Sequence, residues 1–333
     1  MNDLVSLQNR AMAAIKKFQE IESFEDLKMW LLQGRGMSPE TYNSYLESIK
    51  QFYKLFDGLH PLQWTPAHIE EFYDVIRAKN SIRTAQIRIS GIKRVCKNIK
   101  EIMPFWDDPF DVMPESVKSK LKAGERGKKK IALYKTELHA VLHHLKQDET
   151  LKGKQNLAMI LTLVTTGLRA AELCNLTYDD LEHDPDLDIW YLKGVGKGNK
   201  PFHVEVHPDA VESAAAAFKA RFKREWKQGD FLFWSLENYH GKPPVRMNKS
   251  VLWIRLRDIG DQLKRSGLIR KEIEFSAHLF RRTFLSLLSR EGMKTVEIQR
   301  HSRHSNIKTL INHYIDQAES TRPYLDKILG AVA

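Results

Sequence analysis

The sequence contains two arginine-bearing stretches, TTGLRAAEL at residues 165–173 and AHLFRRTF at residues 277–284. The first follows an apolar run at 157–164 that predicts a buried helix, so Arg169 is expected just beyond the end of that helix. In the second stretch, His278 and Arg281 are three residues apart, and side chains at this spacing share one face of a helix. Together the two stretches predict that helices present two arginines and a histidine.

Two further stretches add chemically reactive side chains. Residues 302–315, SRHSNIKTLINHYI, contain His304 and Tyr314, and the glycine-rich turn GVGKGN at 194–199 contains Lys197. Arginines bind phosphate oxygens, histidines transfer protons near neutral pH, and a tyrosine can act as a covalent nucleophile. The combined set contains no carboxylate, and it favours phosphodiester chemistry that uses no metal.

Metal and nucleotide sites are not predicted. His301 and His304 are three residues apart, but no H-E-x-x-H motif, nearby cysteine or nearby acid completes a zinc site. The lysine of GVGKGN is followed by glycine rather than serine or threonine, and an expected strand follows it, which argues against a phosphate-binding loop. We therefore expect no cofactor.

The composition is typical of a globular protein, and the length of 333 residues predicts about two domains. Its net charge of +11 favours a polyanionic partner, although a basic surface can also serve solubility. Two cysteines, Cys96 and Cys174, exclude a disulfide framework. The sequence shows neither a signal-peptide pattern nor an apolar run long enough to span a membrane, so we expect a cytoplasmic protein without a membrane partner.

The first third of the chain is predicted to be helical. Ser38-Pro39 and Thr65-Pro66 are typical helix starts, and a further helix is expected from about Ser81 to Ile99. This last helix is strongly basic, which fits either a solvated face or a helix lying against DNA phosphates. Its candidate DNA-binding residues are Arg83, Arg88, Lys93, Arg94 and Lys97.

Residues 118–130, KSKLKAGERGKKK, are basic, contain two glycines and lack apolar periodicity, so they predict a linker. The predicted organisation is a helical domain at 1–120, a basic linker at 121–130 and a second domain at 131–333. Lys128, Lys129 and Lys130 fit either contact with a DNA backbone or a solvated tether. Two strands are expected near 189–192 and 202–206, joined by a hairpin turn at 194–199. The fold class is therefore mainly α with a small antiparallel sheet.

The sequence resembles the tyrosine recombinases, also called the phage integrase family, over about residues 24–320. Residues 165–181 resemble the first arginine motif of the family, 192–206 its lysine hairpin, 277–284 its H-x-x-R motif and 302–315 its terminal His–Tyr motif. Residues 24–56 resemble its N-terminal core-binding helices. This resemblance implies a two-domain clamp on DNA, with a core-type DNA-binding domain followed by a catalytic domain.

The resemblance implies a role for each matching residue. Arg169 and Arg281 would hold the scissile phosphate, and Tyr314 would attack it to form a 3′-phosphotyrosyl link. Lys197 would protonate the leaving 5′-oxygen, and His278 would assist proton transfer. His304 would bond a phosphate oxygen, and Glu172 would support the geometry. Neither metal nor ATP would be required.

The sequence departs from the family pattern at three places. It has Arg282 after Arg281 where the family often reads H-x-L-R-H. It has Ser302-Arg303 where the family often has Leu-Gly before the histidine, and Tyr314 lies ten residues after His304 rather than nine. A spacing of nine would reach His313, which cannot be the tyrosine nucleophile. His301 is an alternative to His304, and Lys193 and Lys200 are alternatives to Lys197.

The function implied is site-specific recombination of duplex DNA by four protomers through a Holliday junction, in integration, excision or resolution. Accessory DNA-bending or directionality proteins are possible partners. A non-catalytic DNA-binding regulator or architectural protein with the same fold is an alternative hypothesis. A related topoisomerase-like or hairpin-resolving enzyme is another. The complete Arg, Lys, His and Tyr set favours the recombinase, because a protein that only binds DNA needs no tyrosine at this place.

Overall fold

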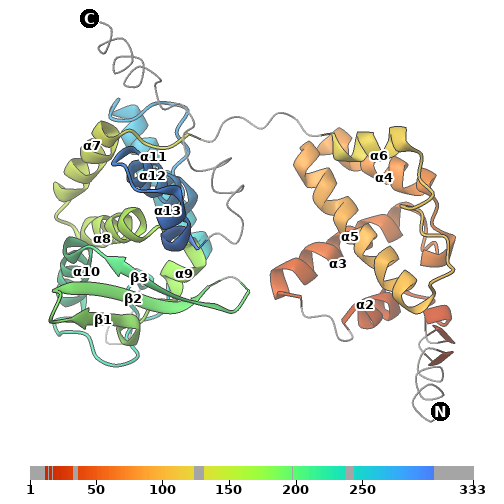
Figure 1. Cartoon of the computed structure of the whole chain (residues 1–333), viewed down its shortest axis with the longest axis horizontal. Coiled ribbons are helices and arrows are strands. Elements are labelled where there is room, and N and C mark those ends of the chain that lie inside the picture. The colour runs from red at the N-terminus through yellow and green to blue at the C-terminus, as the bar shows by residue number, and fades with distance from the viewer. Residues whose placement is uncertain are drawn as a thin grey trace, which may run out of the picture. The chain divides into compact units, whose positions relative to one another are not determined.

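The computed structural model describes residues 12, 13, 15, 16, 18–32, 37–123, 131–196, 198–236 and 244–303. The chain divides into two compact units, Met1–Lys128 and Lys129–Ala333. The helices and strands of each unit are labelled in Figure 1. The domain functions expected from the sequence stay predictions.

The first unit is built from helices whose starts agree with the sequence. Ser38, Thr65 and Ser81 cap three of them, and each side chain accepts a hydrogen bond from a backbone N–H in the first helical turn. The three helix starts predicted from the sequence are thus confirmed. The helices are α2 (Phe24–Leu32), α3 (Pro39–Leu55), α4 (Pro66–Lys79), α5 (Ile82–Ile102) and α6 (Glu115–Lys122), with a short 3-10 turn at Pro61–Gln63.

The core of the first unit lies where α3 and α4 pack against α5. The ring of Phe52 lies 4.6 Å from that of Trp64 and 5.1 Å from that of Phe72, measured between centroids. Helices α3 and α5 approach closely at Gly91, where an added Cβ would lie 2.6 Å from the Cβ of Ser48. A glycine at this position therefore sets the distance between the two helices.

Helix α6 corrects the predicted linker. Leu121 and Lys122 lie in this helix rather than at the start of an irregular segment. Leu121 is buried in the core of the first unit, and Val117 packs against the same core. Two apolar residues among many lysines give too weak a pattern to predict a helix, yet their burial is enough to hold one. The rest of the predicted linker, 124–130, lies outside the described residues.

Helix α8 (Leu151–Thr166) is the central helix of the second unit (Figure 1). It is buried on nearly all sides and packs against α7, α10, α12 and β3. It ends at Gly167 in the left-handed conformation, with φ of 61°. The other helices are α7 (Lys135–Lys146), α9 (Ala170–Asn175), α10 (Pro208–Phe222), α11 (Lys249–Arg265), α12 (Ala277–Arg290) and α13 (Thr295–Ser302), with a 3-10 turn at Tyr178–Asp180.

The sheet of the second unit has three antiparallel strands in the order β1 (Leu181–Asp184), β2 (Ile189–Gly196) and β3 (Lys200–Val206). The predicted fold class is thus confirmed, but β1 was not predicted. The expected turn at 194–199 is also too long, because β2 pairs with β3 up to Gly196 opposite Lys200. Gly194 faces Phe202, whose ring would lie 2.8 Å from an added Cβ, so a glycine is required within the strand.

The start of the second unit is bonded to its interior. The backbone N–H of Leu133 donates to the hydroxyl of Thr283 in α12 at 3.1 Å. The guanidinium of Arg270 donates to the carbonyl of Ala132 at 2.7 Å and to the carboxylate of Glu137. These contacts fix residues 132–134 before α7 begins. No helix in the described part of the chain is long and apolar enough to cross a bilayer.

Candidate active site

Arg169 and Glu172 lie together where α8 gives way to α9. Arg169 is the N-cap of α9, and its backbone N–H donates to Glu172 Oε2 at 2.9 Å. Its guanidinium also donates to Glu172 Oε1 at 2.8 Å. The carboxylate is 3% exposed while the Arg169 side chain is 30% exposed, so the acid holds an arginine that reaches solvent.

Arg303 brings the end of α13 to the same carboxylate. Its guanidinium donates to Glu172 Oε2 at 3.0 Å and lies 4.7 Å from the centre of the Phe202 ring in β3. Glu172 therefore accepts hydrogen bonds from two arginines that are far apart in the sequence.

Two opposing effects act on the ionisation of Glu172. Burial raises the pKa of this carboxyl, but the backbone N–H of Arg169 and the charges of Arg303 and Arg169 outweigh it. The resulting pKa lies below its ordinary value, so Glu172 is ionised at neutral pH. Burial lowers the pKa of the Arg303 guanidinium, and the negative charge of Glu172 opposes that effect.

Arg281 connects three segments of the second unit. It extends from α12, and its side chain is 1% exposed. Its two terminal nitrogens donate to the carbonyls of Gly167, at the end of α8, and Ser302, at the end of α13. The ends of these helices are therefore held beside α12, which brings the segment that begins at Arg169 close to the segment that ends at Arg303.

The end of β2 reaches the same place. An added Cβ at Gly196 would lie 2.7 Å from Glu172 Oε1, so the end of β2 passes directly over the carboxylate. Arg169, Glu172 and Arg281 thus lie on segments that meet at one place, and their catalytic and supporting roles stay predictions. Lys197, which follows Gly196, and His304, which follows Arg303, lie outside the described residues, as does Tyr314.

The remaining candidates occupy separate positions. His278 is exposed in the first turn of α12, one turn before the buried Arg281. Of the alternatives to Lys197, Lys200 starts β3 and Lys193 lies in β2, with its Nζ 3.7 Å from Glu182 Oε2. Neither alternative is shown in contact with Glu172.

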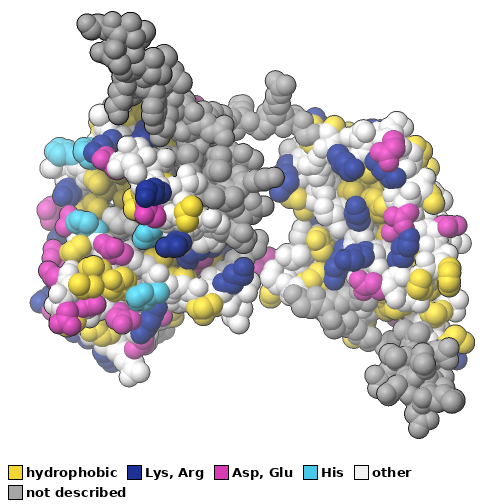
Figure 2. All heavy atoms as spheres, viewed as in Figure 1, with side chains coloured by type: hydrophobic (Ala, Val, Ile, Leu, Met, Phe, Trp, Pro, Cys, Tyr) yellow, Lys and Arg dark blue, Asp and Glu magenta, His cyan; other side chains and the backbone are white. Residues whose placement is uncertain are grey.

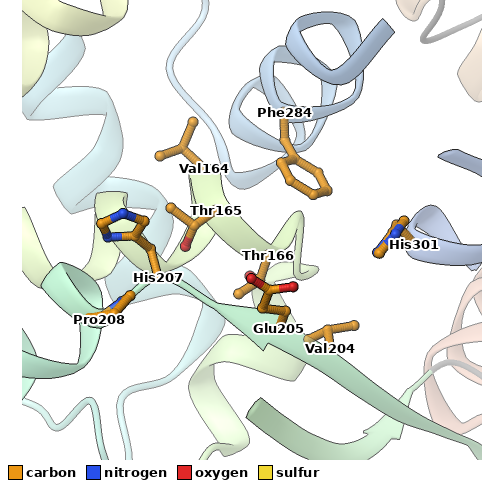
Figure 3. Close-up of a pocket in the computed structure, with 9 residues that line it drawn as sticks. All are labelled: Val164, Thr165, Thr166, Val204, Glu205, His207, Pro208, Phe284 and His301. Atoms are coloured by element: carbon orange, nitrogen blue, oxygen red, sulfur yellow. The ribbon is translucent and has the colours of Figure 1, made fainter. Parts of the chain in front are cut away.

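The alternative to His304, His301, is exposed on α13 and lines a hollow of about 340 Å³. Figure 3 shows the imidazole at one side of this hollow, across from His207. The other lining residues are Val164, Thr165, Thr166, Val204, Glu205, Pro208 and Phe284. In the described part of the chain, no group of three or more His, Cys, Asp or Glu side chains is arranged to hold a metal ion.

The basic helix predicted in the first unit is α5, and its cations have different surroundings. Arg83 and Lys97 are exposed, and Lys93 lies over the ring of Phe110 at 5.6 Å. Arg88 donates to the carbonyl of Ser44 at 3.3 Å, and Arg94 is partly buried. Lys and Arg side chains are spread among acidic ones over the face shown in Figure 2. Lys128, Lys129 and Lys130 lie outside the described residues.

Comparison with known families agrees with this arrangement. The model of the phage integrase family matches residues 132–321, which is more than half of the chain and contains all six predicted catalytic residues. The chain belongs to the phage integrase family. It is therefore a tyrosine recombinase by family, and the family supports site-specific recombination as its activity.

Relatives of this integrase-family chain are similar over different lengths. The tyrosine recombinase XerC of Bacillus pumilus is 24% identical, with 83% of this chain and 85% of that protein covered. The tyrosine recombinase XerD of Halalkalibacterium halodurans is 28% identical over 46% of this chain and only 47% of its own length. The crystal structure of the XerH recombinase bound to its difH substrate is 17% identical, covers 98% of this chain and 88% of that one, and has a TM-score of 0.65. That likeness shows the fold alone.

Arg303 is the member of this integrase-family site that the sequence did not predict. In the sequence, Arg303 is only a departure from the Leu-Gly-His pattern, and that pattern implies no role for it. An arginine in a left-handed helix cap carries no recognisable sequence signal, and its partner Glu172 lies 131 residues away. Only the fold shows that the two side chains meet.

Proposed function

We propose that this chain is a site-specific DNA recombinase that breaks and rejoins duplex DNA through a 3′-phosphotyrosyl intermediate, without metal or ATP. The observation that supports it most is the placement of two arginines at one point: Arg169 is bonded to Glu172, and Arg281 is bonded to the carbonyls of Gly167 and Ser302 at the ends of α8 and α13. Gly196 and Arg303, which adjoin this cluster, directly precede Lys197 and His304 in the sequence.

The chemistry proposed requires positive charge at a phosphodiester and a route for one proton. Arg169 and Arg281 would hold the non-bridging oxygens, because a guanidinium is a planar, charged donor that fits phosphate oxygens. The Tyr314 hydroxyl would give up its proton, with His278 accepting it, and Oη would attack phosphorus and form a new P–O bond while the P–O5′ bond breaks. Lys197 would give the departing 5′-oxygen its proton, and His304 would bond a phosphate oxygen. The reverse steps rejoin the DNA, so the bond energy is retained in the covalent link.

The first unit would serve as the core-type DNA-binding domain, and the second as the catalytic domain. The basic residues of α5, together with Lys128, Lys129 and Lys130, would contact the DNA backbone. We further propose that four copies act on two DNA sites, exchange strands through a Holliday junction and work with accessory DNA-bending or directionality proteins. What supports this assembly is the family, since an exchange between two duplexes requires four cleavages.

Covalent trapping tests the chemistry. Wild type and Tyr314→Phe are incubated with nicked DNA fragments in EDTA and then denatured in SDS. We expect an SDS-resistant adduct, mapped to Tyr314, from wild type only, while both proteins bind DNA with similar affinity. An adduct with Tyr314→Phe would overturn the assignment of the nucleophile. Tight, site-specific binding without any wild-type adduct would favour the non-catalytic DNA-binding protein, and relaxation of supercoils without strand exchange would favour the topoisomerase-like enzyme.

A further inference from the structure

The backbone at Arg303 adopts a conformation that an arginine rarely takes. Its φ of 58° lies in the left-handed region, where a Cβ crowds the neighbouring carbonyl and only glycine is free of strain. Glycine is also the residue that ends most helices of this kind. An arginine at the end of α13 therefore costs conformational energy that a glycine would not, and its side chain must provide an interaction that offsets this cost.

The guanidinium of Arg303 is held on two sides. It lies 4.7 Å from the centre of the Phe202 ring and donates to Glu172 Oε2 at 3.0 Å, and the side chain is only 17% exposed. Its Nε is buried, and within the described part of the chain it has no hydrogen-bond partner. The orientation of the group is therefore set by the ring and the carboxylate.

Arg303 changes both the restraint and the charge at Glu172. Without it, Arg169 would be the one remaining hydrogen-bond partner of the carboxylate among the residues that the structure describes. An isolated Arg169–Glu172 pair has no net charge, whereas the cluster with Arg303 carries one positive charge. A positive cluster is favourable beside a phosphodiester anion.

We propose that Arg303 is a positioning residue that fixes the Glu172 carboxylate, and through it the Arg169 side chain, in the geometry that DNA cleavage needs. This inference rests on the proposed function and deepens it. Arg303 lies at the end of α13 and packs on Phe202 of β3, whereas Arg169 lies at the start of α9. The carboxylate is therefore bonded by residues from two helices instead of one. The hydrogen bond from Arg281 to the carbonyl of Ser302 then fixes the residue just before Arg303.

The test compares Arg303→Gly and Arg303→Lys with a matched control. Lys223 also adopts a left-handed conformation, with φ of 56°, at the end of α10, so Lys223→Gly relieves the same strain away from Glu172. The measurements are the single-turnover rate of adduct formation on nicked DNA, its pH profile, the Kd for the same DNA and the melting temperature.

We expect Arg303→Gly to slow cleavage about tenfold to a hundredfold, because small misplacements of a positioning group have effects of this size. The Kd should stay close to that of wild type, and the melting temperature should change little because relief of the left-handed strain offsets the lost bond to Glu172. Among the described residues, Arg169 and Arg303 are the charged groups bonded to Glu172, so loss of Arg303 raises the pKa of this carboxyl and moves the acid limb of the profile to higher pH. Arg303→Lys, which keeps the charge without the planar group, should restore the profile but only part of the rate.

If Arg303→Gly cleaves DNA with the rate and pH profile of wild type, this inference is overturned, while the proposed function is not. Equal slowing by Lys223→Gly would also overturn it, because backbone freedom would then explain the effect. If Arg303→Gly does not fold, the inference depends on Arg303→Lys, and a wild-type rate in that variant would overturn it. Absence of any wild-type adduct would instead overturn the proposed function, and the inference with it.

Discussion

At the scale of single residues, Glu172 shows how a carboxylate can belong to a site for an anion. Its charge is covered by two guanidiniums and one backbone N–H, so it does not repel a phosphate as an isolated acid would. Replacing it removes a buried charge on which both arginines depend. The effect of replacing Glu172 on stability can be separated from the effect on catalysis by measuring the free energy of unfolding.

Glu172→Gln should destabilise the protein by about 1–3 kcal/mol at neutral pH, because charged hydrogen bonds to a buried group are lost. The pKa of Glu172 is lower in the folded state than in the unfolded chain, so this contribution is fully present above the unfolded pKa of about 4.3. It is lost as the pH falls through the folded pKa. The free energy of unfolding of wild type and variant, measured from pH 7 to pH 3, should therefore converge at the acid end. A constant difference across this range would mean that the charge of Glu172 is not the cause.

At this scale, the sequence can point to a side chain only where that side chain belongs to a recognisable motif. Arg169, Glu172 and Arg281 were predicted to act together, and hydrogen bonds join their segments. Arg303 was not predicted, because its contact depends on a left-handed backbone and on the path of β3. The predicted roles of Lys197, His278, His304 and Tyr314 stay predictions.

At the scale of elements, N-cap residues predict where helices begin more reliably than a few apolar residues predict a whole helix or strand. Ser38, Thr65 and Ser81 cap their helices as expected, because a side-chain oxygen at the N-cap satisfies an otherwise unbonded N–H. Strand β1 was not predicted, because Leu181–Asp184 contains three polar residues out of four and is held mainly by pairing with β2. Helix α6 was missed because its apolar residues are too few.

The close approach of α3 and α5 gives a prediction for Gly91→Ala. The new Cβ would lie 2.6 Å from the Cβ of Ser48, so the helices must separate, at a cost of about 1–3 kcal/mol. Chemical denaturation measures the loss. Ser90→Ala, one residue earlier and exposed, is the control and should change stability little.

Ser48→Gly should recover part of the stability of Gly91→Ala, although a glycine inside a helix costs about 1 kcal/mol by itself. The recovery is therefore taken from the double-mutant cycle, as the coupling energy between the two positions. Additive effects of the two substitutions would show that the helices do not meet at these residues.

At the scale of the whole molecule, the net charge of +11 predicts a steep salt dependence of DNA binding. Arg83 and Lys97 are exposed on α5, and we expect their joint replacement by alanine to lower the slope of log K against log salt by up to about 2. Filter binding or fluorescence anisotropy at several salt concentrations measures this slope.

Lys100→Ala is the control for this measurement, because Lys100 lies on the same helix but is paired with Asp111. It should leave the slope nearly unchanged. If Lys100→Ala lowers the slope as much as the double variant does, total charge rather than this face of α5 governs binding.

The hydrogen bond between Leu133 and Thr283 has a mechanical consequence for the second unit. Thr283 lies two residues after Arg281 in α12, so the start of this unit is attached almost directly to the helix that carries the buried arginine. Tension applied to the chain at residue 131 meets that bond, and the bond from Arg270 to Ala132, before it can stretch α7. Only one or two residues separate residue 131 from these bonds, so a force applied there is transmitted to α12.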